Sequence, residues 1–167
     1  MSRKIDLASV PTRAGSNYPP PLNETGMNKL RHKLGDAAGL TQFGVNRLEL
    51  APGAWSSLRH WHSAEDEFVY VLQGEVVLVT DAGEELLRPG DCAGFRAGDT
   101  DGHHLQNCSG QPAVVLEIGS RLGGDVDYPD VDMLVRDGRR IHKNGRPYPD
   151  PLNPTVFQRD PKDRAIE

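Results

Sequence analysis

Between residues 44 and 120 the sequence is a succession of short apolar runs, each ended by a turn. Turn signals such as Ala51-Pro52-Gly53, Asp81-Ala82-Gly83 and Pro89-Gly90-Asp91 separate the runs. This spacing is typical of an all-β sandwich or barrel, and no helical pattern alternates with the runs. We expect eight strands, at Val45–Leu50, Leu58–His62, Glu67–Leu72, Glu75–Thr80, Glu84–Leu87, Cys92–Phe95, His103–Asn107 and Ala113–Ile118.

Composition narrows the classes of protein to which this chain can belong. Its 167 residues fit one domain, with 19 basic and 24 acidic side chains and a net charge of −5. This balance argues against nucleic-acid binding, and no apolar run approaches the ~20 residues of a membrane-spanning helix. Two cysteines are too few for a disulfide framework, and the N-terminus lacks the apolar segment of a secretory signal. We therefore expect a cytoplasmic protein.

The chain divides into three segments by pattern. An N-terminal arm covers residues 1–43, the barrel covers residues 44–120, and a C-terminal extension covers residues 121–167. The extension is polar and rich in proline. It contains one plausible hairpin, Val131–Val135 with Arg139–Lys143, around an Asp-Gly turn.

The arm carries one helical pattern. Met27, Leu30 and Leu34 recur at the spacing of one helix face. Thr25 is a candidate for the residue that begins this helix, and Gly35 for the residue that ends it. We therefore predict a single short helix in the arm.

Four of the six histidines form two clusters, His60-Trp61-His62 and His103-His104. Because side chains alternate along a strand, His60 and His62 project to the same face. Glu67 begins a strand whose neighbours on the same face are apolar, so its carboxylate lies beside the core if that face is the barrel interior. An unpaired carboxylate there would be costly unless it met a cation.

These side chains together make a donor set suited to a metal. Two imidazoles from one strand, a third from another strand and a carboxylate suit a first-row divalent ion. The donor set alone leaves Zn, Fe, Mn, Ni and Co open, and it leaves coordination positions free for water or substrate. A His-x-His pair by itself is more often a chance pair of polar surface residues. The spacing of the residues around the pair therefore determines whether a metal site is predicted.

Residues 53–74 resemble the first motif of the cupin superfamily, in which a glycine precedes His-x-His, a glutamate and a second glycine. His60, His62, Glu67 and Gly74 match that spacing. The resemblance extends over about residues 44–120 and implies a single cupin barrel, a double-stranded β-helix or jelly roll, with an extension at each end.

Residues 90–107 resemble the second cupin motif, with Gly90, Gly98, His103 and Asn107 at the motif positions. Arg96 stands where the family usually has proline, and the loop between Gly98 and His103 is two residues longer than is usual.

The resemblance implies one divalent metal ion, Zn, Fe, Mn or Ni, held by His60, His62, Glu67 and His103. The lengthened loop puts the fourth ligand in question, and His103 and His104 are the two candidates. His103 fits the spacing to the motif asparagine, and alternation turns His104 to the opposite side.

The resemblance also implies a function, a metal-dependent isomerase or epimerase similar to sugar-phosphate isomerases of the mannose-6-phosphate type. Its substrate would be a small oxygen-rich metabolite. Two alternatives stay open, an Fe(II)-dependent dioxygenase and a small-molecule-binding protein without enzymatic activity. Glu117, which interrupts an apolar strand, is a weak candidate for the general base, with a solvent-facing strand residue as the alternative interpretation.

We expect a homodimer in which the polar arm lends a strand to the partner's sheet.

Overall fold

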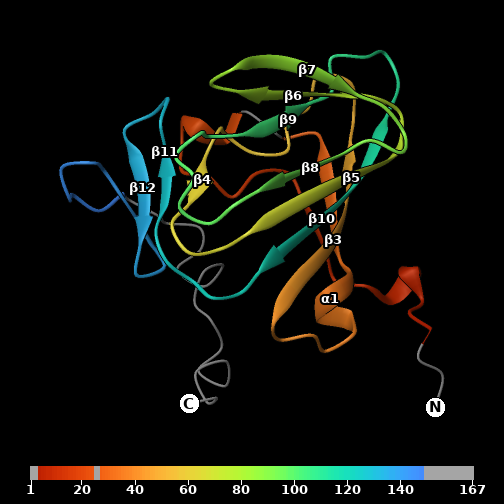
Figure 1. Cartoon of the computed structure of the whole chain (residues 1–167). Helices are drawn as coiled ribbons and strands as arrows, with labels where there is room; N and C mark the ends of the chain where they lie inside the picture. Colours follow the sequence, from red (N-terminus) through yellow and green to blue (C-terminus); the bar gives the residue numbers. More distant parts are fainter. Residues whose placement is uncertain (1–3, 25–26, 149–167) are drawn as a thin grey trace.

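Short apolar runs ended by turns form antiparallel strands in the computed structural model, which describes residues 4–24 and 27–148 (Figure 1). All eight strands expected from the sequence are present, which confirms the all-β fold. They are β3 Phe43–Leu50, β4 Trp61–His62, β5 Glu67–Gln73, β6 Val76–Thr80, β7 Gly83–Leu87, β8 Cys92–Phe95, β9 His104–Gln106 and β10 Ala113–Ser120.

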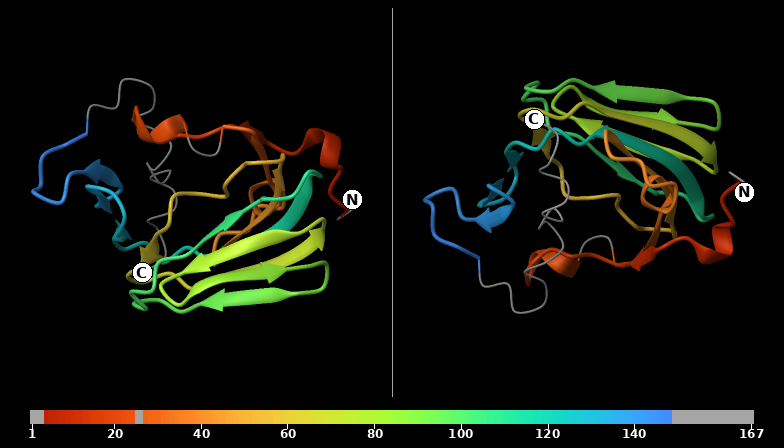
Figure 2. Two further views of the ribbon diagram at one scale, coloured as in Figure 1. Left: turned by 90° about the horizontal axis from the view of Figure 1, so that it is seen from above. Right: turned by 90° about the horizontal axis from the view of Figure 1, so that it is seen from below.

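Two sheets face each other and enclose the core (Figure 2). The larger has the strand order β1-β2-β3-β10-β5-β8, in which β1 is Thr12–Ala14 and β2 is Lys29–Lys33, and the smaller has the order β7-β6-β9. In the larger sheet Val115 on β10 lies in register with Leu48 on β3 and Val71 on β5, and all three side chains are fully buried. These residues therefore mark the inner face of the sheet. Burying each such side chain contributes roughly 1.5–3 kcal/mol.

The arm adds two strands to this sheet instead of the predicted helix, so that prediction is wrong. Strand β1 covers Thr12–Ala14 and β2 covers Lys29–Lys33, and β2 pairs with β3 along its whole length. Pairing with β3 outweighs the helical spacing, because it satisfies the backbone of β2 within a large sheet. Thr25, the predicted start of the helix, lies outside the described residues.

A single α-helical turn, α1 Leu34–Ala37, follows β2 directly. Gly35, the predicted end of the helix, lies inside this turn and packs against β3. A Cβ at Gly35 would lie 2.8 Å from the backbone nitrogen of Val45. The sequence therefore needs glycine here for a close backbone approach rather than for a helix end.

The C-terminal extension folds into β11 Val126–Tyr128, β12 Met133–Arg136 and β13 Arg139–Ile141. Strands β12 and β13 form the predicted hairpin, whose two turn residues have φ values of 50° and 72°, as a type I′ turn requires. Strand β11 pairs with β4. The extension therefore covers the part of the barrel that carries His60 and His62. None of the helices formed by the described residues is long and apolar enough to cross a membrane.

Candidate metal centre

Backbone pairing places the two histidine clusters beside each other. The amide of His60 donates to the carbonyl of His103 at 3.2 Å, and the amide of His103 donates back at 2.9 Å. His62 follows on β4, and Glu67 begins β5. His103 is thus brought inside the barrel beside His60, His62 and Glu67, which lie far from it in the sequence.

Glu67 is the centre on which the three imidazoles converge. Its Oε2 atom lies 2.9 Å from Nε2 of His103, 3.5 Å from Nε2 of His62 and 3.6 Å from Nε2 of His60. The ligand atoms of His60, His62 and Glu67 all lie within 4.8 Å of one another, a grouping that could hold a metal ion. Three imidazole nitrogens and one carboxylate oxygen suit a divalent transition metal.

Neighbouring groups fix which ring nitrogen faces the centre. Nδ1 of His60 lies 3.0 Å from the carbonyl oxygen of Leu58, to which it can only donate. Nδ1 of His62 lies 3.4 Å from a carboxylate oxygen of Glu65. Both contacts leave Nε2 directed at Glu67, which is how outer partners orient histidine ligands in metal sites. Glu65 was not singled out from the sequence, although its position three residues after His62 was a usable signal.

The charge states of these groups follow from burial and from their mutual contacts. Burial raises the pKa of Glu67, but the hydrogen bond with His103 and the nearby histidines outweigh burial and lower that pKa to about 2. Burial lowers the pKa of His60 to about 4. An ionised carboxylate and a neutral imidazole are the forms that coordinate a metal. Burial opposes protonation of His62 also, but the hydrogen bond to Glu65 prevails and raises the His62 pKa.

His104 lies apart from this group. Its Nδ1 is 3.1 Å from the carbonyl oxygen of Ser57, and its Nε2 is 2.9 Å from the side-chain nitrogen of Gln106. Its ring packs against Trp55, with the ring centroids 4.7 Å apart. Both ring nitrogens are therefore occupied, and the structure places His103 rather than His104 beside Glu67, with Phe95 stacked on the His103 ring.

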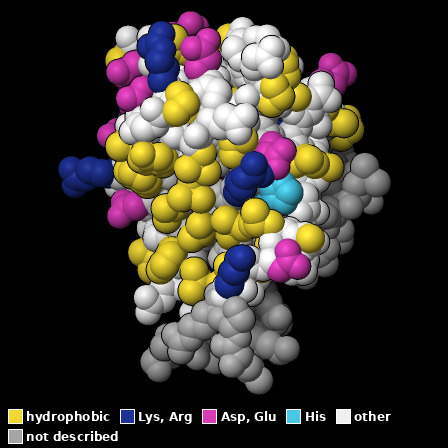
Figure 3. All heavy atoms as spheres, turned by 90° about the vertical axis from the view of Figure 1, so that its right-hand side faces the viewer, with side chains coloured by type: hydrophobic (Ala, Val, Ile, Leu, Met, Phe, Trp, Pro, Cys, Tyr) yellow, Lys and Arg dark blue, Asp and Glu magenta, His cyan; other side chains and the backbone are white. Residues whose placement is uncertain are grey.

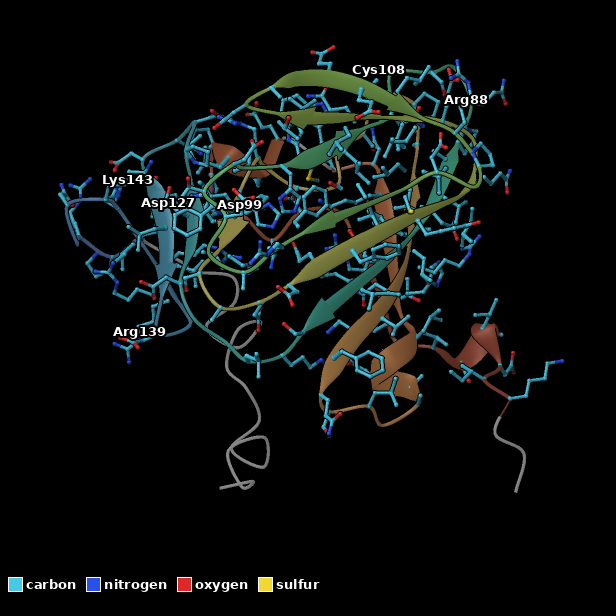
Figure 4. The ribbon with its side chains drawn as sticks, viewed as in Figure 1. Arg88, Asp99, Cys108, Asp127, Arg139 and Lys143 are labelled. Carbon is cyan, nitrogen blue, oxygen red and sulfur yellow. The ribbon has the colours of Figure 1, made fainter. Side chains whose placement is uncertain are left out.

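A cavity of about 240 Å³ opens onto the group, and His62, Glu67 and His103 form part of its wall. Acidic side chains at the mouth include Asp99 and Asp101 of the lengthened loop. Asp99 lies at the end of the barrel that faces the extension (Figure 4). A small polar metabolite could reach the His and Glu side chains through this opening.

Glu117, the candidate base, faces the interior and not the solvent. It lies in register with Val69, whose side chain is in the core. Arg31 on β2 binds both of its carboxylate oxygens, with Nε 2.7 Å from Oε2 and Nη2 2.9 Å from Oε1. No sequence pattern singles out Arg31, because the apolar spacing around it predicts a helix where the structure has β2.

Tyr128 closes the other side of the group, with its ring stacked 5.7 Å from that of His60 and 5.6 Å from the ring of Tyr18 in an edge-to-face contact. These contacts join the extension, the barrel and the arm around one point. Tyr128 lies 68 residues after its partner His60 in the chain, and no local pattern signals such a contact.

The buried Lys29 side chain makes the stability of the protein depend on pH. Its ammonium group is buried and donates to the carbonyl oxygens of Ser56 at 2.6 Å and Trp55 at 3.3 Å. Burial, with a smaller effect of the Arg31 charge, lowers the Lys29 pKa from 10.5 to about 7. Between these two pH values the unfolded chain holds the proton and the native chain does not. Raising the pH therefore stabilises the native state.

We expect the unfolding free energy of the wild type, relative to that of Lys29→Met, to increase by about 2 kcal/mol between pH 7 and pH 9. Below pH 7 the difference should level off, because both states of the wild type are then protonated. Urea unfolding of both proteins at several pH values measures this. A difference that stays constant from pH 6 to pH 9 would show that Lys29 titrates normally.

Comparison with known proteins agrees with the motif spacing and the barrel. The Cupin domain family matches residues 46–119. The crystal structure of a cupin-superfamily sugar phosphate isomerase from Silicibacter pomeroyi is 45% identical, with a TM-score of 0.82, over 87% of this chain and 96% of that chain. The chain belongs to the cupin superfamily. The family resemblance seen in the motifs is therefore confirmed.

Two further structures show how far the similarity of this cupin extends. A protein from Acidithiobacillus ferrooxidans, assigned provisionally as a sugar phosphate isomerase, is 32% identical over 76% of this chain and 82% of that chain, with a TM-score of 0.67. A predicted oxalate decarboxylase from Thermotoga maritima shares the fold at 20% identity, with a TM-score of 0.58 over 71% of this chain and 99% of that chain. No curated protein matches the chain.

Proposed function

We propose that this cupin is a metal-dependent isomerase or epimerase acting on a sugar phosphate. The observation that carries the proposal is the convergence of His60, His62 and His103 on Glu67 beside a cavity. The 45% identity to a protein described as a sugar phosphate isomerase supports the choice of substrate. A small-molecule substrate, a cytoplasmic location and the absence of nucleic-acid or membrane partners are parts of the same proposal.

The residues present fit a divalent metal, since all four donors are nitrogen or carboxylate oxygen and two of the histidines are oriented by outer partners. We propose His60, His62, Glu67 and His103 as its ligands. A metal held there would supply Lewis-acid polarisation of a carbonyl and hydroxyl pair. Isomerisation also requires that a proton move between neighbouring carbons of the substrate.

Glu117 is the candidate for that proton transfer, because its carboxylate faces the same interior and retains 20% side-chain exposure. The two hydrogen bonds from Arg31 hold its orientation. Tyr128 and Phe95 pack on the rings of His60 and His103 and restrict water around them. In this proposal the metal site polarises the carbonyl and hydroxyl pair of the substrate, and Glu117 transfers the proton.

The proposal is tested by reconstituting the protein separately with Zn, Mn, Ni and anaerobic Fe(II). Interconversion of aldose and ketose phosphates is then followed by NMR. We expect turnover with at least one metal, and loss of at least 100-fold of it in Glu117→Gln. His62→Ala should lose both metal and turnover.

Each alternative function has its own result in this experiment. Oxygen uptake with Fe(II) and no isomerisation would favour the dioxygenase. Stoichiometric metal without turnover on any substrate of the panel would favour a binding protein. Absence of metal binding under all conditions would contradict the metalloenzyme itself.

A homodimer is the oligomeric state that we propose, and the outer face of the larger sheet supports it. Figure 3 shows a continuous apolar area on one side of the molecule. Five large apolar side chains on β2, β3 and β5 are each more than a third exposed, namely Leu30, Phe43, Phe68, Tyr70 and Leu72. Apolar areas of this kind mark association surfaces. The arm itself pairs with β3 of its own chain, so the lending of an arm strand to a partner is not needed for this dimer.

We expect sedimentation velocity at tens of micromolar to give a dimer for the wild type. A charge on this face, Tyr70→Glu, should shift the protein to monomer, because an ionised group would be buried without a partner. The matched substitution Val77→Glu, on the smaller sheet, should leave the dimer intact. A monomeric wild type would overturn the proposal.

A further inference from the structure

Three arginines from three different strands gather at the interior next to the candidate metal centre. Arg13 on β1 and Arg31 on β2 are direct partners in the antiparallel pair. Arg31 is in turn in register with the fully buried Leu48, so this face of the arm continues the barrel interior. Arg140 on β13 approaches from the extension, with its guanidinium carbon 5.7 Å from the ring centroid of Tyr18.

The contacts of Arg13 leave its charge without a carboxylate partner among the described residues. Glu117 is already bound through both oxygens to Arg31. Arg13 and Arg140 both donate to the side-chain oxygen of Asn17, each at 3.1 Å, and this acceptor is neutral. Nε of Arg13 is buried and has no hydrogen-bond partner in the described part of the chain.

This arrangement opposes folding unless something compensates it. Like charges directly opposite each other on paired strands are destabilising, and a buried cation without a counter-charge costs more. Burial and the adjacent Arg31 charge lower the pKa of Arg13 and together outweigh the Glu117 carboxylate, which raises that pKa. A bound anion would satisfy the Nε donor and offset the repulsion between the two guanidinium groups.

We propose that Arg13, with Arg31 and Arg140 beside it, is a subsite for the phosphate group of the substrate. A guanidinium presents a planar pair of donors that matches a phosphate. Solvent reaches this interior, because the Arg31 side chain retains 17% exposure. The identification of the anion as a substrate phosphate rests on the proposed isomerase function.

The position of the subsite fits a substrate with one phosphorylated end. Tyr18 and Tyr128 lie between the arginines and His60, through ring contacts of 5.6 and 5.7 Å. The cavity beside the His and Glu side chains is lined by Glu65, Asp99 and Asp101 against a single basic residue, Arg96, and by none of the three arginines. A phosphate dianion is repelled by those carboxylates and attracted to the arginines, so the carbonyl end would face the His and Glu side chains.

Inorganic phosphate is the probe for this subsite. Thermal unfolding of the full-length protein is followed in EDTA at pH 7.5, with phosphate titrated against sodium chloride of equal ionic strength, so that phosphate cannot bind through a metal. We expect a saturable rise of the unfolding midpoint in the wild type. Arg13→Gln should weaken the apparent affinity for phosphate at least tenfold.

Arg139→Gln is the matched control, because Arg139 is the exposed neighbour of Arg140 and lies at the outer end of the hairpin (Figure 4). It should bind phosphate like the wild type. Arg13→Lys keeps the charge and tests the donor geometry if Arg13→Gln does not fold, and it should weaken binding at least threefold. Equal stabilisation by phosphate and chloride in the wild type, or wild-type affinity in the Arg13 variants, would overturn the proposal.

Kinetics separate this inference from the proposed function. If the isomerase activity is present, Arg13→Gln should raise KM for the phosphorylated substrate at least tenfold and change kcat less. If no sugar phosphate is turned over but phosphate still binds through Arg13, the anion subsite stands and the isomerase proposal fails.

Discussion

Glu67→Gln is expected to lower the affinity for a divalent metal by about 100-fold or more, a larger effect than changing an outer partner would have. The reason is geometric. One carboxylate oxygen of Glu67 lies within 3.6 Å of three imidazole nitrogens. Glutamine keeps the size of the side chain but replaces an anionic donor with a neutral one, and it removes the charge that offsets the ion. Isothermal titration of the metal-free protein with Zn or Mn measures the loss.

The control for this prediction is Glu84→Gln, the same chemical change at an exposed position on β7. It should bind metal like the wild type. Circular dichroism of both variants verifies that the barrel is intact. If Glu67→Gln retains wild-type affinity, Glu67 is not a ligand, and the three histidines would have to hold the metal without it.

The barrel was predictable because its strands carry their own signals. Apolar runs such as β6 Val76–Thr80 are bounded by glycine turns, and the inner and outer faces alternate as the pattern requires. The arm reverses this pattern. In β2, the polar side chains Lys29 and Arg31 face the interior and the apolar Leu30 faces outward, 41% exposed. Because the inward-facing side chains of β2 are cationic, the apolar residues alone do not show the alternation of a strand. Their spacing therefore predicted a helix.

In the candidate site, the residues that could be predicted are those whose position follows from nearby sequence. Alternation along one strand predicts that His103 and His104 point to opposite faces, and the spacing to Asn107 favours His103 as the inward one. In the structure His103 is the one that lies 2.9 Å from Glu67. Glu65, which orients His62, lies close enough in sequence to have been found. Arg31 and Tyr128 contact the site only through the pairing of the arm and the extension with the barrel. Such contacts depend on tertiary structure that local periodicity does not contain.

Asn107→Ala is expected to destabilise the protein by about 3 kcal/mol, which lowers the thermal midpoint by about 6–12 °C for a domain of this size. Asn107 is fully buried just beyond β9. Its side-chain nitrogen donates to the carbonyl oxygens of Leu50 at 2.9 Å and Gln111 at 2.8 Å. Its side-chain oxygen accepts from the amide and hydroxyl of Ser109 at 3.0 and 2.8 Å. Alanine removes all four bonds. The Ser109 hydroxyl and the Gln111 carbonyl still bond each other at 2.9 Å, but the buried carbonyl of Leu50 loses its side-chain donor, and a buried polar group that loses a partner costs desolvation energy.

Two further variants show whether these hydrogen bonds carry the effect. Asn107→Asp keeps the acceptor for Ser109 but loses both donated bonds and buries a charge, so it should be at least as unstable as Asn107→Ala at pH 7. Asn28→Ala makes the same truncation at an exposed asparagine and should change the midpoint by less than about 2 °C. Differential scanning calorimetry measures all three. If Asn107→Ala unfolds within 2 °C of the wild type, the side-chain bonds of Asn107 contribute little to stability. The backbone hydrogen bonds of Asn107 with Gly53 and Ala54 would then be sufficient to hold the end of β3 to the turn after β9. The motif asparagine would then have to serve some purpose other than stability.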